Sequence, residues 1–159
     1  MASGSNVQGN LTEAKRLISL AAQAGACLVV LPENFAHMGM DEFDKLVIAE
    51  QSGEGVIQDF LAEQARQHKI WIVGGTIPIA TPESTHVNAA CLVFDDAGNQ
   101  VARYDKFHLF DVEIQDTQEK YAESETISAG DSLVWFNSPL VVLVSQFVMT
   151  FAFLSYSGS

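Results

Sequence analysis

The sequence predicts an α/β fold in which helices cover a mixed sheet. Two observations carry this prediction: amphipathic helical segments alternate with short apolar runs, and a later turn-rich stretch joins two strand-like segments. The order helix, strand, helix, strand, hairpin is typical of a mixed sheet with helices packed against it. With 159 residues, of which 48% are hydrophobic, the chain fits one domain with a sizeable core.

The first predicted helix runs from Leu11 to Gly25, where apolar residues recur at three- and four-residue steps. Asn10 is the expected N-cap, with Glu13 as its partner in a capping box. The apolar run from Cys27 to Leu31 is too short for a helix. It fits a strand buried on both faces, and Pro32 ends that strand.

The second predicted helix is amphipathic and runs from Val56 to Lys69. A second buried strand follows from Ile70 to Gly75, with Thr76 to Ala80 as a candidate extension. The segments Val87–Phe94 and Gln100–Tyr104 flank a five-residue connection rich in Asp, Gly and Asn, which predicts a hairpin.

Composition excludes several classes of function. Twenty acidic residues against eight basic ones give a formal charge of -12, which argues against nucleic acid or an anionic membrane as partner. Met1 to Asn10 lacks the features of a signal peptide, so we expect a cytoplasmic protein. Cys27 and Cys91 lie in apolar runs without metal-ligand spacing. We expect two buried, reduced thiols and neither metal nor cofactor, while a disulfide between them stays open.

Two short segments carry candidate chemistry. LVVLPENF places Glu33 after the first predicted strand, and YDKFHLFDV places Lys106 after a later one. Because sites in open α/β sheets gather beyond the carboxyl ends of strands, Glu33 and Lys106 could converge there. A carboxylate can then act as a general base and an ammonium can stabilise an oxyanion. The alternative for each is a solvated or salt-bridged loop residue.

Several ordered motifs give the chain a family resemblance. GACLVVLPENF, IVGGTIPI, NAACLVFDDAGNQVARYDKFHLFDVEI and ESETISAGDSL together resemble the nitrilase, or carbon–nitrogen hydrolase, superfamily, from about Asn10 to Pro139. The continuation HLFDVEI is most similar to the branch that includes deaminated glutathione amidase and omega-amidase. The resemblance implies an αββα sandwich, incomplete here, in which a mixed sheet carries helices on one face.

The resemblance also implies a chemistry. In this family a cysteine thiolate attacks a carbonyl or nitrile carbon, a glutamate moves the proton, a lysine stabilises the tetrahedral intermediate, and water hydrolyses the acyl-enzyme. By motif match, Glu33 is the general base and Lys106 the lysine. Glu123 is the better match for a supporting glutamate, with Glu125 as the alternative, and His108 is expected to shape the loop after Lys106. The implied substrate is a small amide, and relatives commonly form homo-oligomers.

The chain departs from the family pattern after Pro139. The family continues in a pattern like GRLGLxVCYDxRFPE, which holds the nucleophile, whereas this chain reads LVVLVSQFVMTFAFLSYSGS and holds no cysteine there. We therefore expect residues 1–139 to form a partial hydrolase domain without its first strand. Residues 140–159 are expected to be an apolar tail in place of the nucleophile segment.

Three interpretations of this tail stay open. It could be a membrane segment, although Leu140 to Leu154 falls short of the roughly twenty residues a span needs. It could be a divergent core strand with a disordered end. The third interpretation, a reading-frame change, is our hypothesis, because one base inserted after Pro139 permits FGRLGLTVCYDVRFPELFRE across the whole tail. Because the nucleophilic cysteine is absent, we expect this chain to be an inactive amidase-family member, with a non-catalytic, ligand-binding remnant as the alternative.

Overall fold

The computed structural model describes residues 1–41, 43–83, 85–114, 119–138, 142–146 and 150–154. Its centre is a five-stranded mixed sheet, in which β1 pairs parallel to β2 and β4 pairs antiparallel to β2, β3 and β5. The strands are β1 Leu28–Val30, β2 Trp71–Val73, β3 Ile77–Ala80, β4 Val87–Phe94 and β5 Gln100–Asp105. The predicted α/β class with a mixed sheet is confirmed.

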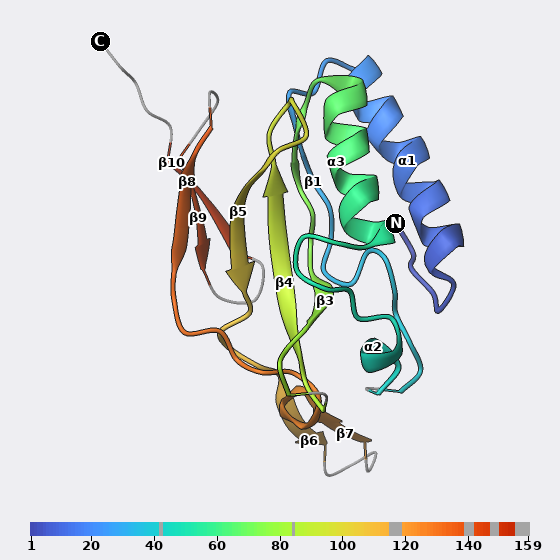
Figure 1. The fold of residues 1–159 in the computed structure, drawn as a ribbon, viewed down its shortest axis with the longest axis vertical. Coiled ribbons are helices and arrows are strands. Elements are labelled where there is room, and N and C mark those ends of the chain that lie inside the picture. The colour runs from blue at the N-terminus through green and yellow to red at the C-terminus, as the bar shows by residue number, and fades with distance from the viewer. Residues whose placement is uncertain (42, 84, 115–118, 139–141, 147–149, 155–159) are drawn as a thin grey trace.

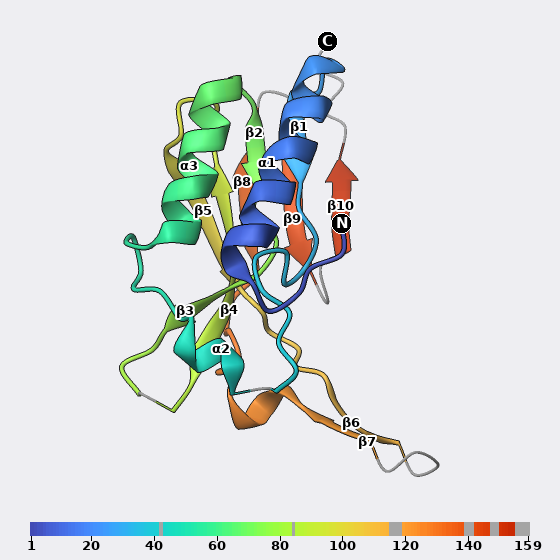
Figure 2. The ribbon, with the colours of Figure 1, turned by 90° about the vertical axis from the view of Figure 1, so that its right-hand side faces the viewer.

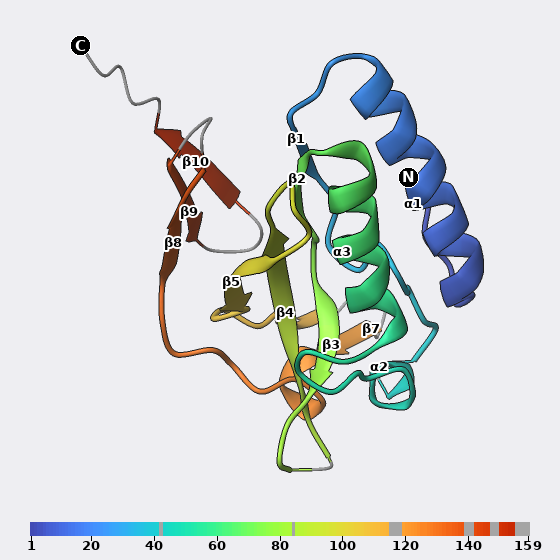
Figure 3. The ribbon, with the colours of Figure 1, turned by 45° about the horizontal axis from the view of Figure 1, so that its top comes forward.

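Two helices, α1 Val7–Gln23 and α3 Val56–His68, cover one face of this sheet (Figures 1 and 3). Their buried stripes, such as Ile18 and Leu61, pack in one cluster with Ile72 and Leu92 of the sheet. Because side chains alternate across a strand, β4 sends Leu92 to the helices and Cys91 to the other face. The predicted placement of helices on one face is confirmed.

The second face packs against β8 Val134–Asn137, whose Phe136 ring stacks on Trp71 with centroids 6.3 Å apart. β8 belongs to an antiparallel sheet with β9 Val142–Gln146 and β10 Thr150–Leu154, which lies on the side away from the helices (Figure 1). The predicted tail thus contains two strands. Residues 139–141, 147–149 and 155–159 lie outside the described residues. No helix in the described ranges has the length and apolar character needed to cross a membrane.

The start of α1 differs from the prediction. The helix begins at Val7, and its N-cap is Asn6, whose Oδ1 accepts a hydrogen bond from the backbone N–H three residues on at 3.0 Å. Asn10 is therefore inside the helix and is not its cap. Glu13, the predicted capping-box partner, pairs instead with Arg16 at 2.8 Å. Both Asn6 and Asn10 fit the sequence preference for an N-cap residue. The side chain of Asn10 instead makes a tertiary hydrogen bond, which is described below.

The first strand is less buried than predicted. Of the strands that the structure describes, only β2 pairs with β1, and Val30 is 39% exposed. Cys27, just before this strand, is exposed, whereas Cys91 is buried, so the prediction of two buried thiols is wrong for Cys27. Both cysteines are free, which excludes the disulfide between them.

The candidate extension after the second strand is present as a separate strand. β2 and β3 lie along the same edge of β4, and the three residues between Val73 and Ile77 face the two between Val93 and Ala90. This extra residue is a bulge at Gly74–Gly75, and Gly75 has a φ of +59°. The predicted hairpin is also confirmed, with its second strand ending one residue later than expected.

Several short elements lack a sequence signal. They are the one-turn helix α2 Asp44–Val47, the hairpin β6 Asp111–Ile114 with β7 Glu119–Ala122, and the 3₁₀ turn η1 Glu123–Glu125. Figure 2 shows the β6–β7 hairpin projecting from the body of the molecule. Each is too short for hydrophobic periodicity to reveal it. α2 and η1 nevertheless contribute side chains to the site.

Candidate active site

Glu33 is fixed at the carboxyl end of the sheet by its backbone. The N–H of Leu31 donates to the carbonyl of Val73 at 2.9 Å, which extends the β1–β2 pairing to the residue before Pro32. Pro32 has no N–H and ends the pairing. Gly75, in its left-handed conformation, lies so near that a Cβ there would collide with the carbonyl oxygen of Pro32. Glycine at this bulge therefore allows the Glu33 loop to approach the sheet.

The loop after Glu33 is held at several points. Asn34 adopts a left-handed conformation with a φ of 54°, which asparagine tolerates, and its N–H donates to Thr76 Oγ1 at 3.1 Å. Phe35 is fully buried in the core. Asn10 Nδ2 donates to the carbonyl of Ala36 at 2.9 Å. This is the tertiary hydrogen bond that Asn10 makes instead of capping the helix. These contacts keep Glu33 at a defined position.

Lys106 follows β5 directly and is 4% exposed. Its backbone N–H donates to the carbonyl of Ala89 at 2.9 Å, and its own carbonyl accepts from the N–H of Gly130 at 2.9 Å. Tyr104 Oη accepts from the N–H of Phe107 at 3.2 Å and fixes the loop that follows. The lysine backbone is thus anchored on both sides, and its side chain points toward Glu33.

Glu123 is brought to the same place by η1. Its Oε2 accepts from the N–H of Phe110 at 2.8 Å, and its side chain is 12% exposed. Lys106 pairs with Glu123, whereas Glu125, the alternative sequence match, is exposed and lines the outer cleft. His108 packs edge-on against Phe107 with ring centroids 4.7 Å apart, in the loop after Lys106.

These three side chains meet although their residues are far apart in the sequence. Lys106 Nζ lies 2.8 Å from Glu33 Oε1, 2.8 Å from Glu123 Oε2 and 3.0 Å from Glu123 Oε1. The predicted convergence of Glu33 and Lys106 is confirmed. Burial lowers the pKa of Lys106, but the hydrogen bonds and charges of Glu123 and Glu33 outweigh it, so the net pKa is raised.

The cluster is poorly explained as a stabilising salt bridge alone. Taking three charges out of water costs free energy that their attraction only partly returns. Two carboxyl groups also share one ammonium, so a single lysine is the partner of both glutamates. Chemically, this arrangement presents a carboxylate that can accept a proton next to an N–H donor that can stabilise an oxyanion.

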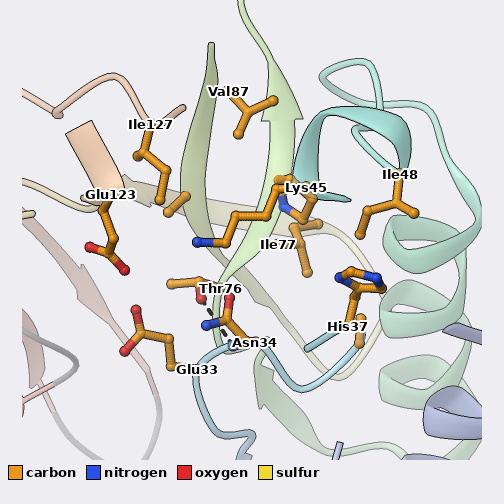
Figure 4. A pocket seen from close by; sticks show the side chains of 13 residues that line it. Glu33, Asn34, His37, Lys45, Ile48, Thr76, Ile77, Val87, Glu123 and Ile127 are labelled. Carbon is orange, nitrogen blue, oxygen red and sulfur yellow. Dashed lines mark hydrogen bonds between the residues drawn. The ribbon is translucent and has the colours of Figure 1, made fainter. Parts of the chain in front are cut away.

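The cluster opens into a small inner pocket of about 10 Å³, roughly the room for one water. Figure 4 shows Glu33 and Glu123 on one side, with His37 on the other and Lys45 reaching in from α2. An outer cleft of about 550 Å³ shares four lining residues with the pocket: Asn34, His37, Lys45 and Glu123. A small molecule can therefore approach the cluster through the outer cleft.

Neither cysteine reaches this site. Cys27 lies before β1, at the opposite end of the strand from Glu33. Cys91 faces the side of the sheet away from the helices, and burial raises the pKa of its thiol to about 12. In the described part of the chain, no group of three or more His, Cys, Asp or Glu side chains is placed to hold a metal ion.

Sequence reasoning missed His37 and Lys45, which line the pocket. Both lie in a stretch without apolar periodicity, between β1 and α3, and α2 is only four residues long. No local pattern distinguishes them from solvated loop residues. Only the tertiary arrangement brings them beside Glu33.

Known proteins resemble this chain over most of its length. The carbon–nitrogen hydrolase family model matches residues 1–149. A deaminated glutathione amidase of Yersinia enterocolitica is 35% identical over 144 residues, which are 88% of this chain and 49% of that protein. An omega-amidase of Xenopus laevis is 34% identical over 131 residues, 82% of this chain and 45% of that protein. The chain thus spans about half the length of these relatives.

Solved structures show the same fold. The NitFhit protein of C. elegans superposes with a TM-score of 0.74 and 27% identity, over 94% of this chain and 34% of that one. A branch 10 nitrilase-superfamily protein of Saccharomyces cerevisiae gives a TM-score of 0.71 and 26% identity, over 87% and 48% of the two chains. Sequence, fold and family model together show that this chain belongs to the carbon–nitrogen hydrolase, or nitrilase, family, in the branch of its deaminated glutathione amidase and omega-amidase relatives.

Proposed function

We propose that the Glu33–Lys106–Glu123 cluster is the amide-processing site of a hydrolase for small amides of the omega-amide type. One observation carries the proposal: Lys106, 4% exposed, is held between two carboxylates at the carboxyl end of the sheet. The names of the amidase relatives support this substrate class. The free thiols Cys27 and Cys91 are in keeping with a reducing, cytoplasmic setting, which we also propose.

The proposed reaction uses the thiol of the family's nucleophilic cysteine, which the segment after Pro139 carries in the family pattern and which this sequence lacks. Glu33 removes the thiol proton, and the thiolate attacks the amide carbon while Lys106 hydrogen-bonds the developing oxyanion. The tetrahedral intermediate collapses, the proton on Glu33 passes to the leaving nitrogen, and ammonia departs. Glu33 then deprotonates a water that hydrolyses the thioester, which releases the acid and the thiol.

Glu123 has a positioning role in this scheme. Both of its oxygens accept from Lys106 Nζ, and the N–H of Phe110 holds Glu123. The ammonium is thereby fixed before an oxyanion forms, so little reorganisation is needed in the transition state. The same bonds raise the pKa of Lys106 and favour its ammonium form, which brings a positive charge to the oxyanion.

For the 159-residue chain itself, we propose binding without turnover. Cys27 and Cys91 are both away from the cluster, so no cysteine of this sequence supplies the nucleophile. Residues that act together in covalent catalysis are non-additive, and loss of the nucleophile alone removes most of the rate. The second candidate function is therefore a ligand-binding remnant, which the intact Glu33–Lys106–Glu123 geometry favours.

Ammonia release from succinamate tests the proposal. We expect none from the 159-residue chain, and release from a chain that carries FGRLGLTVCYDVRFPELFRE in place of residues 140–159. Mass spectrometry of this second chain should find the acyl group on the introduced cysteine, and Glu33→Gln should abolish it. Isothermal titration of the 159-residue chain with succinamate tests binding separately. Absence of both acylation and binding would overturn the proposal.

A further inference from the structure

We propose that the groove between α1 and α3 binds a small zwitterion, namely a free α-amino acid with an apolar side chain. The groove has a volume of about 490 Å³, within the usual range of small-molecule sites. It lies in the helical layer, where α1 and α3 run next to each other (Figures 1 and 3). It shares no lining residue with the inner pocket or the outer cleft, so this site is separate from the proposed amide site.

The floor of the groove is apolar. Leu11 of α1 is part of the core beneath the helices, Phe60 of α3 packs against that core, and both line the groove. Val56, in the first turn of α3, also lines the groove and is 65% exposed. An apolar side chain laid along this floor would cover Val56 and leave water itself, which is favourable. The floor therefore favours a ligand with an apolar body.

The two walls of the groove carry opposite charges. Lys15 lies on the α1 wall, and Asp59 and Glu63 lie on the α3 wall. Asp59 and Glu63 are four residues apart, so they are neighbours on one helix face, where like charges repel. Among the residues that the structure describes, none of the three side chains forms an ion pair. A ligand ammonium at the two carboxylates and a ligand carboxylate at Lys15 would complete this arrangement.

The groove also contains an unpaired acceptor. Gln64 lines the groove and is 1% exposed, and its Oε1 has no hydrogen-bond partner in the described part of the chain. A buried acceptor without a donor costs free energy, which a ligand N–H would recover. The terminal torsion of glutamine is broad, so the amide can rotate to present Oε1 to a ligand. Because an ammonium has three donors, one ammonium can bond both Gln64 and Glu63.

These features together select a class of ligand. A simple amine meets Lys15 as a like charge, and a simple carboxylate meets Asp59 and Glu63 as like charges. A molecule that carries both groups on an apolar body pairs with each wall and covers the floor. A free α-amino acid has this form, and L-leucine is the probe. Its matched analogues are 3-methylbutylamine, which lacks the carboxylate, and 4-methylpentanoate, which lacks the ammonium.

The experiment titrates the isotope-labelled 159-residue chain with each probe and follows its amide signals by NMR, which detects weak binding. We expect L-leucine to give saturable shifts at the amides of Lys15, Glu63 and Gln64, including the side-chain amide of Gln64. L-leucine should bind about fivefold more tightly than either analogue, because each exposed ion pair contributes little. Equal affinity for all the probes, or no saturable shift with L-leucine, would overturn the proposal.

Variants separate the two walls and the floor. Lys15→Met should remove the preference for L-leucine over 3-methylbutylamine, and Glu63→Gln should reduce the preference over 4-methylpentanoate. Gln64→Leu should weaken L-leucine binding without lowering the urea midpoint, because an apolar side chain replaces an unsatisfied acceptor. A lower midpoint with unchanged L-leucine affinity would show that Gln64 serves the fold alone, and would overturn the site.

Matched controls remove the same groups elsewhere. Lys69→Met and Asp96→Asn take an exposed lysine and an exposed carboxylate from outside the groove, so both should leave the affinities unchanged. A second copy of the chain is the competing occupant, and sedimentation velocity detects it. A dimer that Lys15→Met or Glu63→Gln dissociates would show that another protomer covers the groove, and would overturn the proposal. A monomer that binds L-leucine and loses the preference in Lys15→Met supports it.

Discussion

Replacement of Lys106 by methionine tests whether the lysine ammonium stabilises the fold by pairing with Glu33 and Glu123. The lysine is 4% exposed and bonds two carboxylates, whose side chains are 27% exposed for Glu33 and 12% for Glu123. Removing one member of a buried ion pair costs about 3–5 kcal/mol, because the remaining charge stays unpaired. Glu33 is partly solvated, which lowers the expected cost to about 2–4 kcal/mol.

Urea unfolding followed by circular dichroism at pH 7 measures this loss as a lower midpoint. The variant Lys106→Met with Glu33→Gln and Glu123→Gln should recover much of it, because no unpaired charge then remains. Lys15→Met removes an exposed lysine and should change the unfolding free energy by less than about 0.5 kcal/mol. If Lys106→Met is as stable as Lys15→Met, the account of the cluster is wrong.

Three further predictions use other features of the site. The pKa of Lys106 in the folded chain is raised above its ordinary 10.5, so its stabilising contribution is fully present below pH 10.5 and is lost as the pH rises through the folded pKa. The difference in unfolding free energy between the unsubstituted chain and Lys106→Met, measured by urea titration, should therefore narrow above pH 10.5. A difference that stays constant to pH 12 would contradict this. Gly75→Ala should cost about 2–4 kcal/mol, since it adds a collision with a backbone carbonyl to the strain of a positive φ, whereas Gly53→Ala, at a φ of +83° with no atoms nearby, should cost only about 1 kcal/mol. Equal costs would refute the collision. Iodoacetamide should label Cys27 in the native chain and both cysteines after unfolding, because the buried Cys91 thiol has a pKa of about 12; native labelling of Cys91, read by mass spectrometry, would contradict its burial.

The sequence predicted the regular elements because their signals are local. The helix from Val56 and the hairpin around Asp95 depend on apolar spacing and turn residues, and both are present. Asn10 was assigned as a cap because the rule sees only neighbours, whereas its side chain is bound to a carbonyl 26 residues away. The exposure of Val30 depends on which strand lies beside it, and no local pattern records that.

The site divides in the same way. Glu33 and Lys106 could be placed because each follows an apolar strand, and strand ends meet at one edge of a sheet. Glu123 came from the family resemblance alone, since a 3₁₀ turn of three residues gives no periodic signal. His37 and Lys45 became visible only with the pocket, because their positions result from loop packing against Gly39 and α2.

The central proposal is that the Glu33–Lys106–Glu123 cluster binds an amide and that this chain does not hydrolyse it. The most direct test incubates the 159-residue chain with succinamate and records ammonia together with the side-chain NMR signals of Lys106. The account predicts saturable shifts of the Lys106 Cε–H signals and no ammonia above the blank. Ammonia release that Glu33→Gln abolishes, or Lys106 signals that never move, would contradict it.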